Sequence, residues 1–183
     1  MKKCLLIVLI LLCSMVYAQE NYKGKISLVF NKKKIELPFN IVSLRKENNI
    51  IINARAELNK ENIHQLINIQ LSLKDLSTNE RSIDVSKSFL FEMRNRMSKQ
   101  QYGNILLLSL DRNTNKSNIR YSEKGYRWKI ASFNLSMGLT EISFVENRLI
   151  IKGKFNIEAW SEESKEPFKP VVEIKNGKFE III

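Results

Sequence analysis

"LIIKGKFNIEA" at residues 149–159 and "VVEIKNGKFEIII" at residues 171–183 both contain the tripeptide Gly-Lys-Phe. In the first stretch an apolar or small residue occupies every second position. The set that shares a face is Leu149, Ile151, Gly153, Phe155, Ile157 and Ala159. A period of two is typical of a strand with one buried face. We therefore predict that Phe155 lies in the core and that Lys154 points to solvent.

The second stretch contains Asn176-Gly177, a residue pair that two-residue hairpin turns prefer because both positions need a positive φ. We expect a hairpin here, with Ile174 opposite Phe179. In this interpretation Gly-Lys-Phe marks the entry of a strand and places Phe179 in the core. A phosphate-binding loop would instead need several glycines before a helix.

Alternation of apolar and polar residues recurs along most of the chain. It covers residues 26–30, 35–41, 50–58, 67–73, 126–135 and 142–151. The connections, such as Asn31-Lys32-Lys33, have the length of turns and are too short for crossover helices. We therefore predict an all-β fold, an antiparallel β-sandwich or sandwich-like barrel of about 9–12 strands.

Three segments give more specific expectations. Phe89, Met93 and Met97 are spaced by four, so a short helix over residues 86–100 competes with a strand there. "GNILLLSLD" at 103–111 is apolar on both faces, which predicts a strand covered on both sides. A hairpin that turns at Glu146-Asn147 would place Phe144 opposite Leu149 and Ile142 opposite Ile151.

The first residues, "MKKCLLIVLILLCSMVYAQE", have the layout of a signal peptide: two lysines, an apolar run and small residues before a cleavage site. We predict cleavage between Ala18 and Gln19, which leaves one β domain over 19–183. The apolar run is shorter than the roughly 20 residues that span a bilayer, so no transmembrane segment is expected after cleavage. The protein is expected to be exported, either periplasmic or secreted.

Both cysteines, Cys4 and Cys13, lie in the predicted signal peptide. The mature chain would then have no disulfide, no thiolate nucleophile and no cysteine metal site. Cys13 follows Leu12 rather than a small residue, so anchoring as a lipoprotein is not favoured.

The chain is basic, with a net charge of +11, and loss of Lys2 and Lys3 with the signal peptide lowers this to +9. A basic exported protein suits an anionic partner such as an envelope glycan or a lipid surface. However, 21 of the 30 basic residues are lysines. Anion sites usually favour arginine, so the charge is also consistent with compositional bias. Nucleic acid is not an expected partner.

"NIRYSEKGYRWKI" at 118–130 is the best candidate for ligand binding, because it interleaves cations with aromatic residues. The candidate residues are Arg120, Tyr121, Lys124, Tyr126, Arg127, Trp128 and Lys129. Strand parity separates Tyr126 and Trp128 from Arg127 and Lys129. One ligand would therefore contact both groups only if the strand twists or bulges.

No catalytic residue, metal site or cofactor is predicted. His64 is the only histidine, and zinc needs three or four suitable ligands. The carboxylates Glu158, Glu162, Glu163 and Glu166 are close in sequence and could serve a glycosidase, but the lysines beside them are typical of a solvated loop.

The C-terminal order "TEISF", "LIIKGKFNIEA", a charged loop and "VEIKNGKFEIII" resembles uncharacterised exported β-sandwich proteins of the Bacteroidota. The resemblance covers residues 139–183 and implies a fold and a compartment, but no activity. We therefore expect an exported, non-enzymatic module with a binding or structural role in the cell envelope. A small hydrophobe-carrying β-barrel and a glycan-active enzyme are the alternatives.

Overall fold

A computed structural model describes residues 23–46, 49–60, 63–73, 86–97, 103–111, 114, 116–166 and 168–183. These residues form strands and the connections between them, and none of them is helical. The strands are β1 Gly24–Phe30, β2 Lys33–Pro38, β3 Ile41–Lys46, β4 Ile50–Lys60, β5 Ile63–Leu73, β6 Ser86–Met97, β7 Asn104–Asp111, β8 Lys116–Glu123, β9 Tyr126–Trp128, β10 Ile130–Val145, β11 Arg148–Ser161 and β12 Val172–Ile182. Within these ranges no helix is long and apolar enough to cross a membrane.

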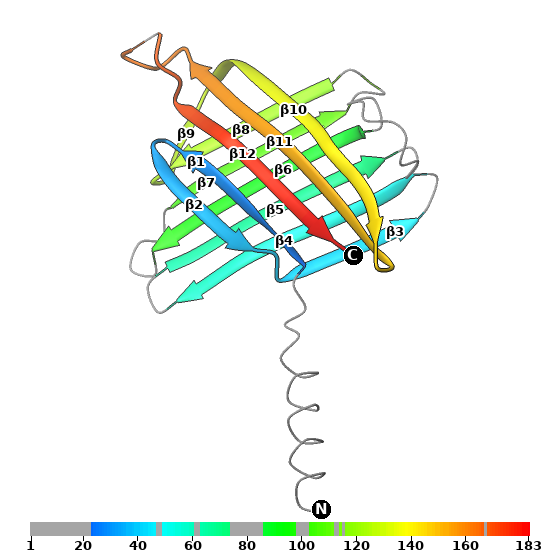
Figure 1. The fold of residues 1–183 in the computed structure, drawn as a ribbon. Coiled ribbons are helices and arrows are strands. Elements are labelled where there is room, and N and C mark those ends of the chain that lie inside the picture. The colour runs from blue at the N-terminus through cyan, green and yellow to red at the C-terminus, as the bar shows by residue number, and fades with distance from the viewer. Residues whose placement is uncertain are drawn as a thin grey trace, which may run out of the picture.

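The strands form two antiparallel sheets, which confirms the predicted all-β sandwich (Figure 1). One sheet has five strands in the order β10-β11-β12-β1-β2, and the other has seven in the order β3 to β9. Neighbours in the sheets are neighbours in the chain, except that β12 pairs with β1. This pairing brings the end of the chain to its first strand, so the described parts of both termini lie in one sheet.

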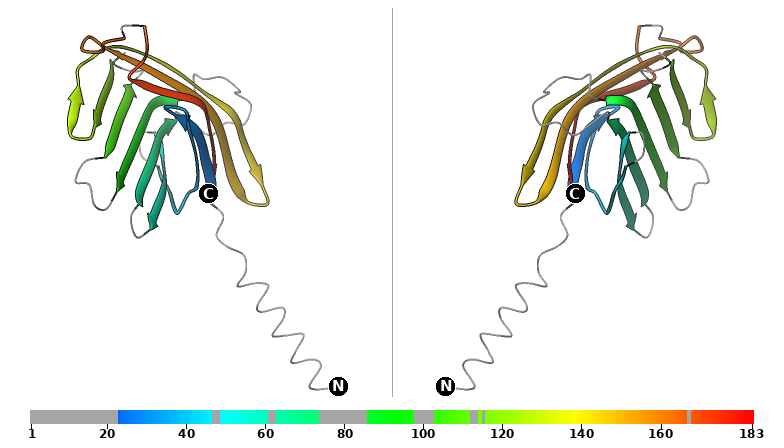
Figure 2. Two further views of the ribbon diagram at one scale, coloured as in Figure 1. Left: turned by 90° about the vertical axis from the view of Figure 1, so that its left-hand side faces the viewer. Right: turned by 90° about the vertical axis from the view of Figure 1, so that its right-hand side faces the viewer.

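The chain passes from one sheet to the other at two corners, at residues 39–40 and at Lys129. The strands of the two sheets cross each other (Figure 1), and the sheets form two layers that diverge toward one end (Figure 2). At the first corner the Phe39 N–H donates to Gly24 and the Asn40 N–H donates to Arg55, with donor–acceptor distances of 2.9 Å for both bonds. Such corners are typical of sandwiches whose sheets cross at a large angle.

The core lies between the sheets and centres on Phe155 of β11. Its ring centroid is 5.2 Å from that of Phe91, 6.0 Å from Phe89 and 6.4 Å from Phe179. Phe155 is 1% exposed and Phe179 is 3% exposed, so both are core residues as the strand parity predicts. Tilted ring pairs at these distances add to the stability gained from burial.

The two Gly-Lys-Phe copies pair with each other across β11 and β12. Gly153 is opposite Phe179, Lys154 is opposite Lys178, and Phe155 is opposite Gly177. A Cβ added to Gly153 would lie 2.2 Å from Cζ of Phe179, and one added to Gly177 would lie 2.6 Å from the backbone oxygen of Phe155 and 2.8 Å from Cε1 of its ring. Each phenylalanine ring therefore occupies the space that the opposite glycine leaves free. The predicted role as a strand entry is wrong for both copies, because each lies in the middle of its strand, and the tripeptide is instead a packing unit of the sheet.

The predicted hairpin at Asn176-Gly177 is wrong, because β12 runs through this pair without turning. Asn176 has a φ of 54°, and the registers with β1 and β11 both shift here. These features identify a β-bulge, in which the extra residue bends the strand. The Asn176 N–H donates to Oδ1 of Asn156 over 2.9 Å. A hairpin would have broken the pairing of β12 with its two neighbours, so the sheet decides the conformation that the local sequence leaves open.

The hairpin between β10 and β11 is confirmed. Glu146 and Asn147 have φ values of 49° and 64°, and Phe144 and Ile142 lie opposite Leu149 and Ile151. The β1–β2 connection also turns at the expected place, where Asn31 and Lys32 have φ values of 44° and 70°. Both turns have a positive φ at their two central positions, which matches the twist of the flanking strands.

Of the two alternatives for 86–100, the helix is wrong and the strand is observed where the structure describes the chain, since β6 pairs with β5 along its length and with β7 over residues 88–95. Phe89, Phe91 and Met93 point into the core with a period of two.

Two further expectations, one for β7 and one for residues 35–41, also fail. In β7, Leu106 and Leu108 are buried but Leu107 is only half-buried, so one face alone is fully covered. Ile41 is 52% exposed because the corner before β3 resets the parity of the strand.

Candidate ligand-binding cleft

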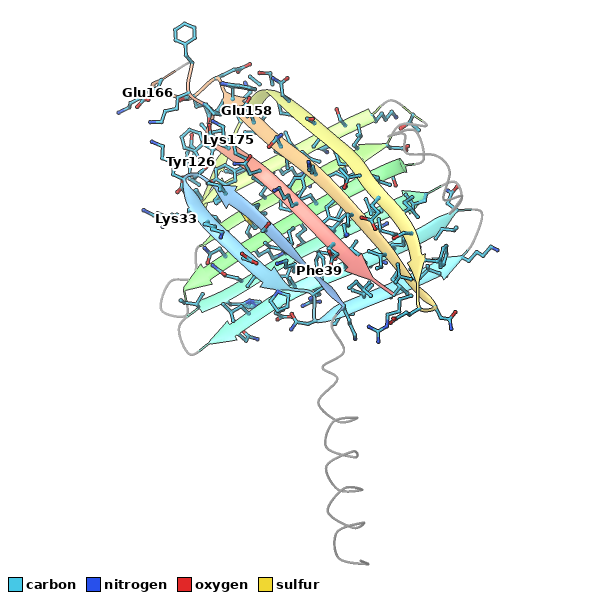
Figure 3. The ribbon with its side chains drawn as sticks, viewed as in Figure 1. Lys33, Phe39, Tyr126, Glu158, Glu166 and Lys175 are labelled. Atoms are coloured by element: carbon cyan, nitrogen blue, oxygen red, sulfur yellow. The ribbon has the colours of Figure 1, made fainter. Side chains whose placement is uncertain are left out.

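A cleft of about 820 Å³ lies at the end of the sandwich where the β1–β2 turn, the β8–β9 hairpin and the β11–β12 loop meet. Figure 3 shows Tyr126, Glu166 and Lys175 gathered at this end, with Lys33 of β2 on the same side. The lining residues are Asn31, Lys32, Glu123, Trp128, Glu163, Ser164, Lys165, Glu166, Lys169, Pro170, Val171 and Glu173. Charges of both signs thus surround one indole ring.

The cleft forms because its walls are tied together over a long sequence separation. The Asn31 N–H donates to the Glu173 carbonyl, and the Glu173 N–H donates to Oδ1 of Asn31, with donor–acceptor distances of 2.9 Å for both bonds. On the other wall, the Ser161 hydroxyl donates to the Lys129 carbonyl over 2.7 Å. The β11–β12 loop is therefore held between the first turn and the second corner.

Trp128 is the predicted ligand-binding residue that lines this cleft. Its ring stands edge-on to that of Tyr126, with centroids 5.1 Å apart and an interplanar angle of 82°. The Tyr126 hydroxyl donates to Oε2 of Glu163 over 2.8 Å, and this bond raises the pKa of Tyr126. The Trp128 indole N–H is buried and has no acceptor among the described residues. The pair forms an aromatic corner, and Tyr126 of this pair is bonded to Glu163 of the loop.

Tyr121 does not belong to the site, although the sequence predicts it there. It is opposite Trp128 in the β8–β9 pair but is 1% exposed, and its ring is 6.3 Å from that of Phe30. Burial raises the pKa of Tyr121. This tyrosine is a core residue because its strand position faces the opposite sheet and lies farther from the edge.

The predicted cations lie on other surfaces. Arg120, Arg127 and Lys129 line a second cleft, of about 450 Å³, which shares Trp128 with the first. The Lys129 ammonium pairs with Glu162 over 3.0 Å, which raises the pKa of Lys129. Lys124 is exposed in the β8–β9 turn with a φ of 50° and lines neither cleft. Trp128 therefore shares this second cleft with Arg127 and Lys129, so the separation that parity predicts is wrong here, because the chain leaves the seven-stranded sheet at Lys129.

Sequence reasoning missed the lining residues Asn31, Lys32, Pro170 and Val171. Asn31 meets Glu173 only because β1 pairs with β12, and a hydrogen bond between residues 142 apart in sequence leaves no local signal. Only a correct prediction that β1 pairs with β12 would have placed these residues in one cleft.

The carboxylates of the β11–β12 region are mostly engaged. Glu163 accepts from Tyr126, Glu162 pairs with Lys129, and Glu166 pairs with Lys169 over 2.9 Å. Glu158 does not line the cleft and lies opposite Glu173 in the sheet. Across the described ranges, no group of three or more His, Cys, Asp or Glu residues could hold a metal ion.

His64 lies in β5, and its Nε2 is 3.4 Å from Oε1 of Glu57. It is on a different sheet from β11 and β12, and it does not line the cleft.

The chain matches no family model, and no curated protein and no solved structure is significantly similar to it.

Proposed function

We propose that the protein is an exported, non-enzymatic binding module of the cell envelope, and that the cleft beside Trp128 holds a sugar unit of an envelope glycan. The observation that carries this proposal is the Tyr126–Trp128 corner in a cleft of about 820 Å³. An indole face suits the apolar side of a sugar ring, and the carboxylates, lysines and Ser164 around it suit hydroxyl groups. Lining charges of both signs favour a polar ligand over an apolar one.

A carrier for a hydrophobic molecule needs a cavity lined by the inward Leu, Ile and Phe residues. The rings of Phe89, Phe91, Phe155 and Phe179 instead pack against one another between the sheets. The two clefts near Trp128 are lined largely by charged and polar side chains. These features support a filled core with binding at the surface.

We expect Trp128→Ala to weaken binding to the best ligand of an envelope-glycan array by roughly 30-fold, the effect of about 2 kcal/mol from a buried aromatic anchor. Titration calorimetry with the mature chain measures this change. Trp160→Ala is the matched control because Trp160 is the other tryptophan and does not line the cleft. Equal losses in both variants would contradict the proposed site. Release of new reducing ends from the glycan would contradict the non-enzymatic assignment.

Export is tested separately by the mature N-terminus. We expect intact-mass analysis of the native protein to give a chain that begins at Gln19 without lipid, because Ala18 and Val16 fit a signal-peptidase site. A diacylglyceryl adduct on Cys13 would show lipoprotein anchoring, and an intact Met1 would show that the chain is not processed. Met1 and Cys13 lie outside the ranges that the structure describes.

A further inference from the structure

The outer face of the five-stranded sheet carries a second, basic groove, of about 620 Å³. Figure 1 looks onto this sheet, where β11, β12, β1 and β2 lie side by side in front of the other layer. The groove is lined by five lysines and two glutamates, Lys25, Lys34, Lys152, Lys154, Lys178, Glu36 and Glu180, together with Ser27, Leu28, Val29, Thr140, Gly153, Asn176 and Phe179. Positive charge is therefore in excess on one concave surface.

One row of residues across the sheet has matched charges. Glu141, Lys152, Glu180 and Lys25 are successive partners across β10, β11, β12 and β1. Lys152 pairs with Glu141 over 2.8 Å and approaches Glu180 at 3.9 Å. The bond to Glu141 raises the pKa of Lys152. Alternating signs of this kind stabilise a sheet.

The next row lacks this compensation. Lys154 and Lys178, the central residues of the two Gly-Lys-Phe copies, are direct partners, and their neighbours in the row are Gly138 and Ser27. Both lysines are exposed, and neither forms an ion pair with a carboxylate of the described residues. Like charges directly opposite each other destabilise a sheet. An anion bound between the two ammonium groups would reverse this effect.

Two further lysines of the groove, Lys25 of β1 and Lys34 of β2, add positive charge beside this pair. Lys25 and Lys34 both pair with Glu36, at 3.2 and 3.5 Å. Residues two apart on a strand are separated by about 6.7 Å, and adjacent strands by about 4.8 Å. The groove thus presents cations at intervals that suit a chain with repeated anionic groups.

We propose that this groove binds a linear anionic glycan, one with sulfate or carboxylate groups along its length, and that Lys154 and Lys178 hold one such group between them. This inference goes beyond the Trp128 cleft and does not depend on it. The exposed large hydrophobic residues of the described chain, which include Phe144 and Phe168, do not line the groove, so it lacks the apolar anchors of a membrane-binding surface. The ring of Phe179 packs over Gly153 and is 3% exposed, which leaves no aromatic platform for nucleobases.

The test measures binding of fluorescent dextran sulfate to the mature chain, with neutral dextran as the uncharged control. We expect K154Q/K178Q to bind about tenfold more weakly, and to lower the slope of log affinity against log salt by about 2, one for each lost contact. K46Q/K116Q removes the same charge from exposed positions of the other sheet and should change affinity less than about twofold. We also expect K154Q/K178Q to melt no lower than the wild type without ligand, because the substitution removes a repulsion.

Several outcomes would overturn the inference. Equal losses in the two double variants would indicate a diffuse field without a site, and so would equal losses in a variant that neutralises Arg120, Lys124, Arg127 and Lys129. Absence of binding at an ionic strength of about 0.01 M, where screening is weak, would remove the anion site altogether. Equal binding to duplex DNA or to phosphatidylglycerol vesicles would overturn the choice of a glycan. Trp128→Ala should leave dextran sulfate binding unchanged, so failure of the cleft and failure of the groove are distinguishable.

Discussion

Replacement of Phe155 by alanine is expected to lower the free energy of unfolding by about 3–5 kcal/mol. Phe155 is 1% exposed and contacts the rings of Phe89 and Phe91 from the seven-stranded sheet and Phe179 from its own sheet. Truncation removes the main aromatic contact between the layers and leaves a cavity that the sheets can close only in part. Urea denaturation of the mature chain, followed by fluorescence, measures the change.

Phe168→Ala is the matched control because Phe168 is 96% exposed in the β11–β12 loop. The same substitution there should change the unfolding free energy by less than about 0.5 kcal/mol. Similar midpoints for the two variants would mean that the two sheets do not pack through Phe155, and that the core described above is wrong.

The buried face of most strands could be predicted from sequence because the side-chain period of a strand is fixed at two. The parity of residues 149–159 placed Leu149, Ile151 and Phe155 on the buried side, as observed. Parity fails where the chain changes sheet, as at Ile41, because a corner rotates the strand and restarts the alternation. In β6 a period of four coexists with the period of two, so the sequence pattern alone did not decide between a helix and a strand.

Asn176-Gly177 shows why a local turn signal is not sufficient. The pair permits a positive φ, and Asn176 does adopt one, but a positive φ serves a bulge as well as a hairpin. The choice between a bulge and a hairpin depends on whether β12 has pairing partners along its whole length. Those partners, β1 and β11, come from opposite ends of the chain, so no window of sequence contains the information.

The candidate sites were only partly predictable for the same reason. Trp128 could be identified because aromatic and basic residues are adjacent in sequence, but parity wrongly separated it from Arg127, since both line the cleft of about 450 Å³ at the sheet corner. The walls of the cleft come from three distant segments, and the lysine pair of the groove comes from two strands whose register is set by the bulge at Asn176. A slip of one residue in that register would place Lys154 opposite a different neighbour.

The paired Gly-Lys-Phe motifs give the second large expected effect. We expect Gly153→Ala to destabilise the wild type by about 1–3 kcal/mol, because the new Cβ would lie 2.2 Å from Cζ of Phe179. Gly153 has no positive φ, so the backbone itself accepts alanine. The cost would then come entirely from the ring that covers the glycine.

The same substitution is expected to change sign when that ring is removed. In a Phe179→Ala background, Gly153→Ala should stabilise the protein by about 0.5–1 kcal/mol, since glycine within a strand is normally less favourable than alanine. Chemical denaturation of the two single variants and the double variant gives the coupling energy between the positions. Additive changes would show that Phe179 does not pack over Gly153, and the repeated tripeptide would then have no packing role. A coupling of about 1.5 kcal/mol or more would instead explain why glycine and phenylalanine occur in both copies at the same spacing: in the antiparallel pair, each copy provides the space that the other one fills.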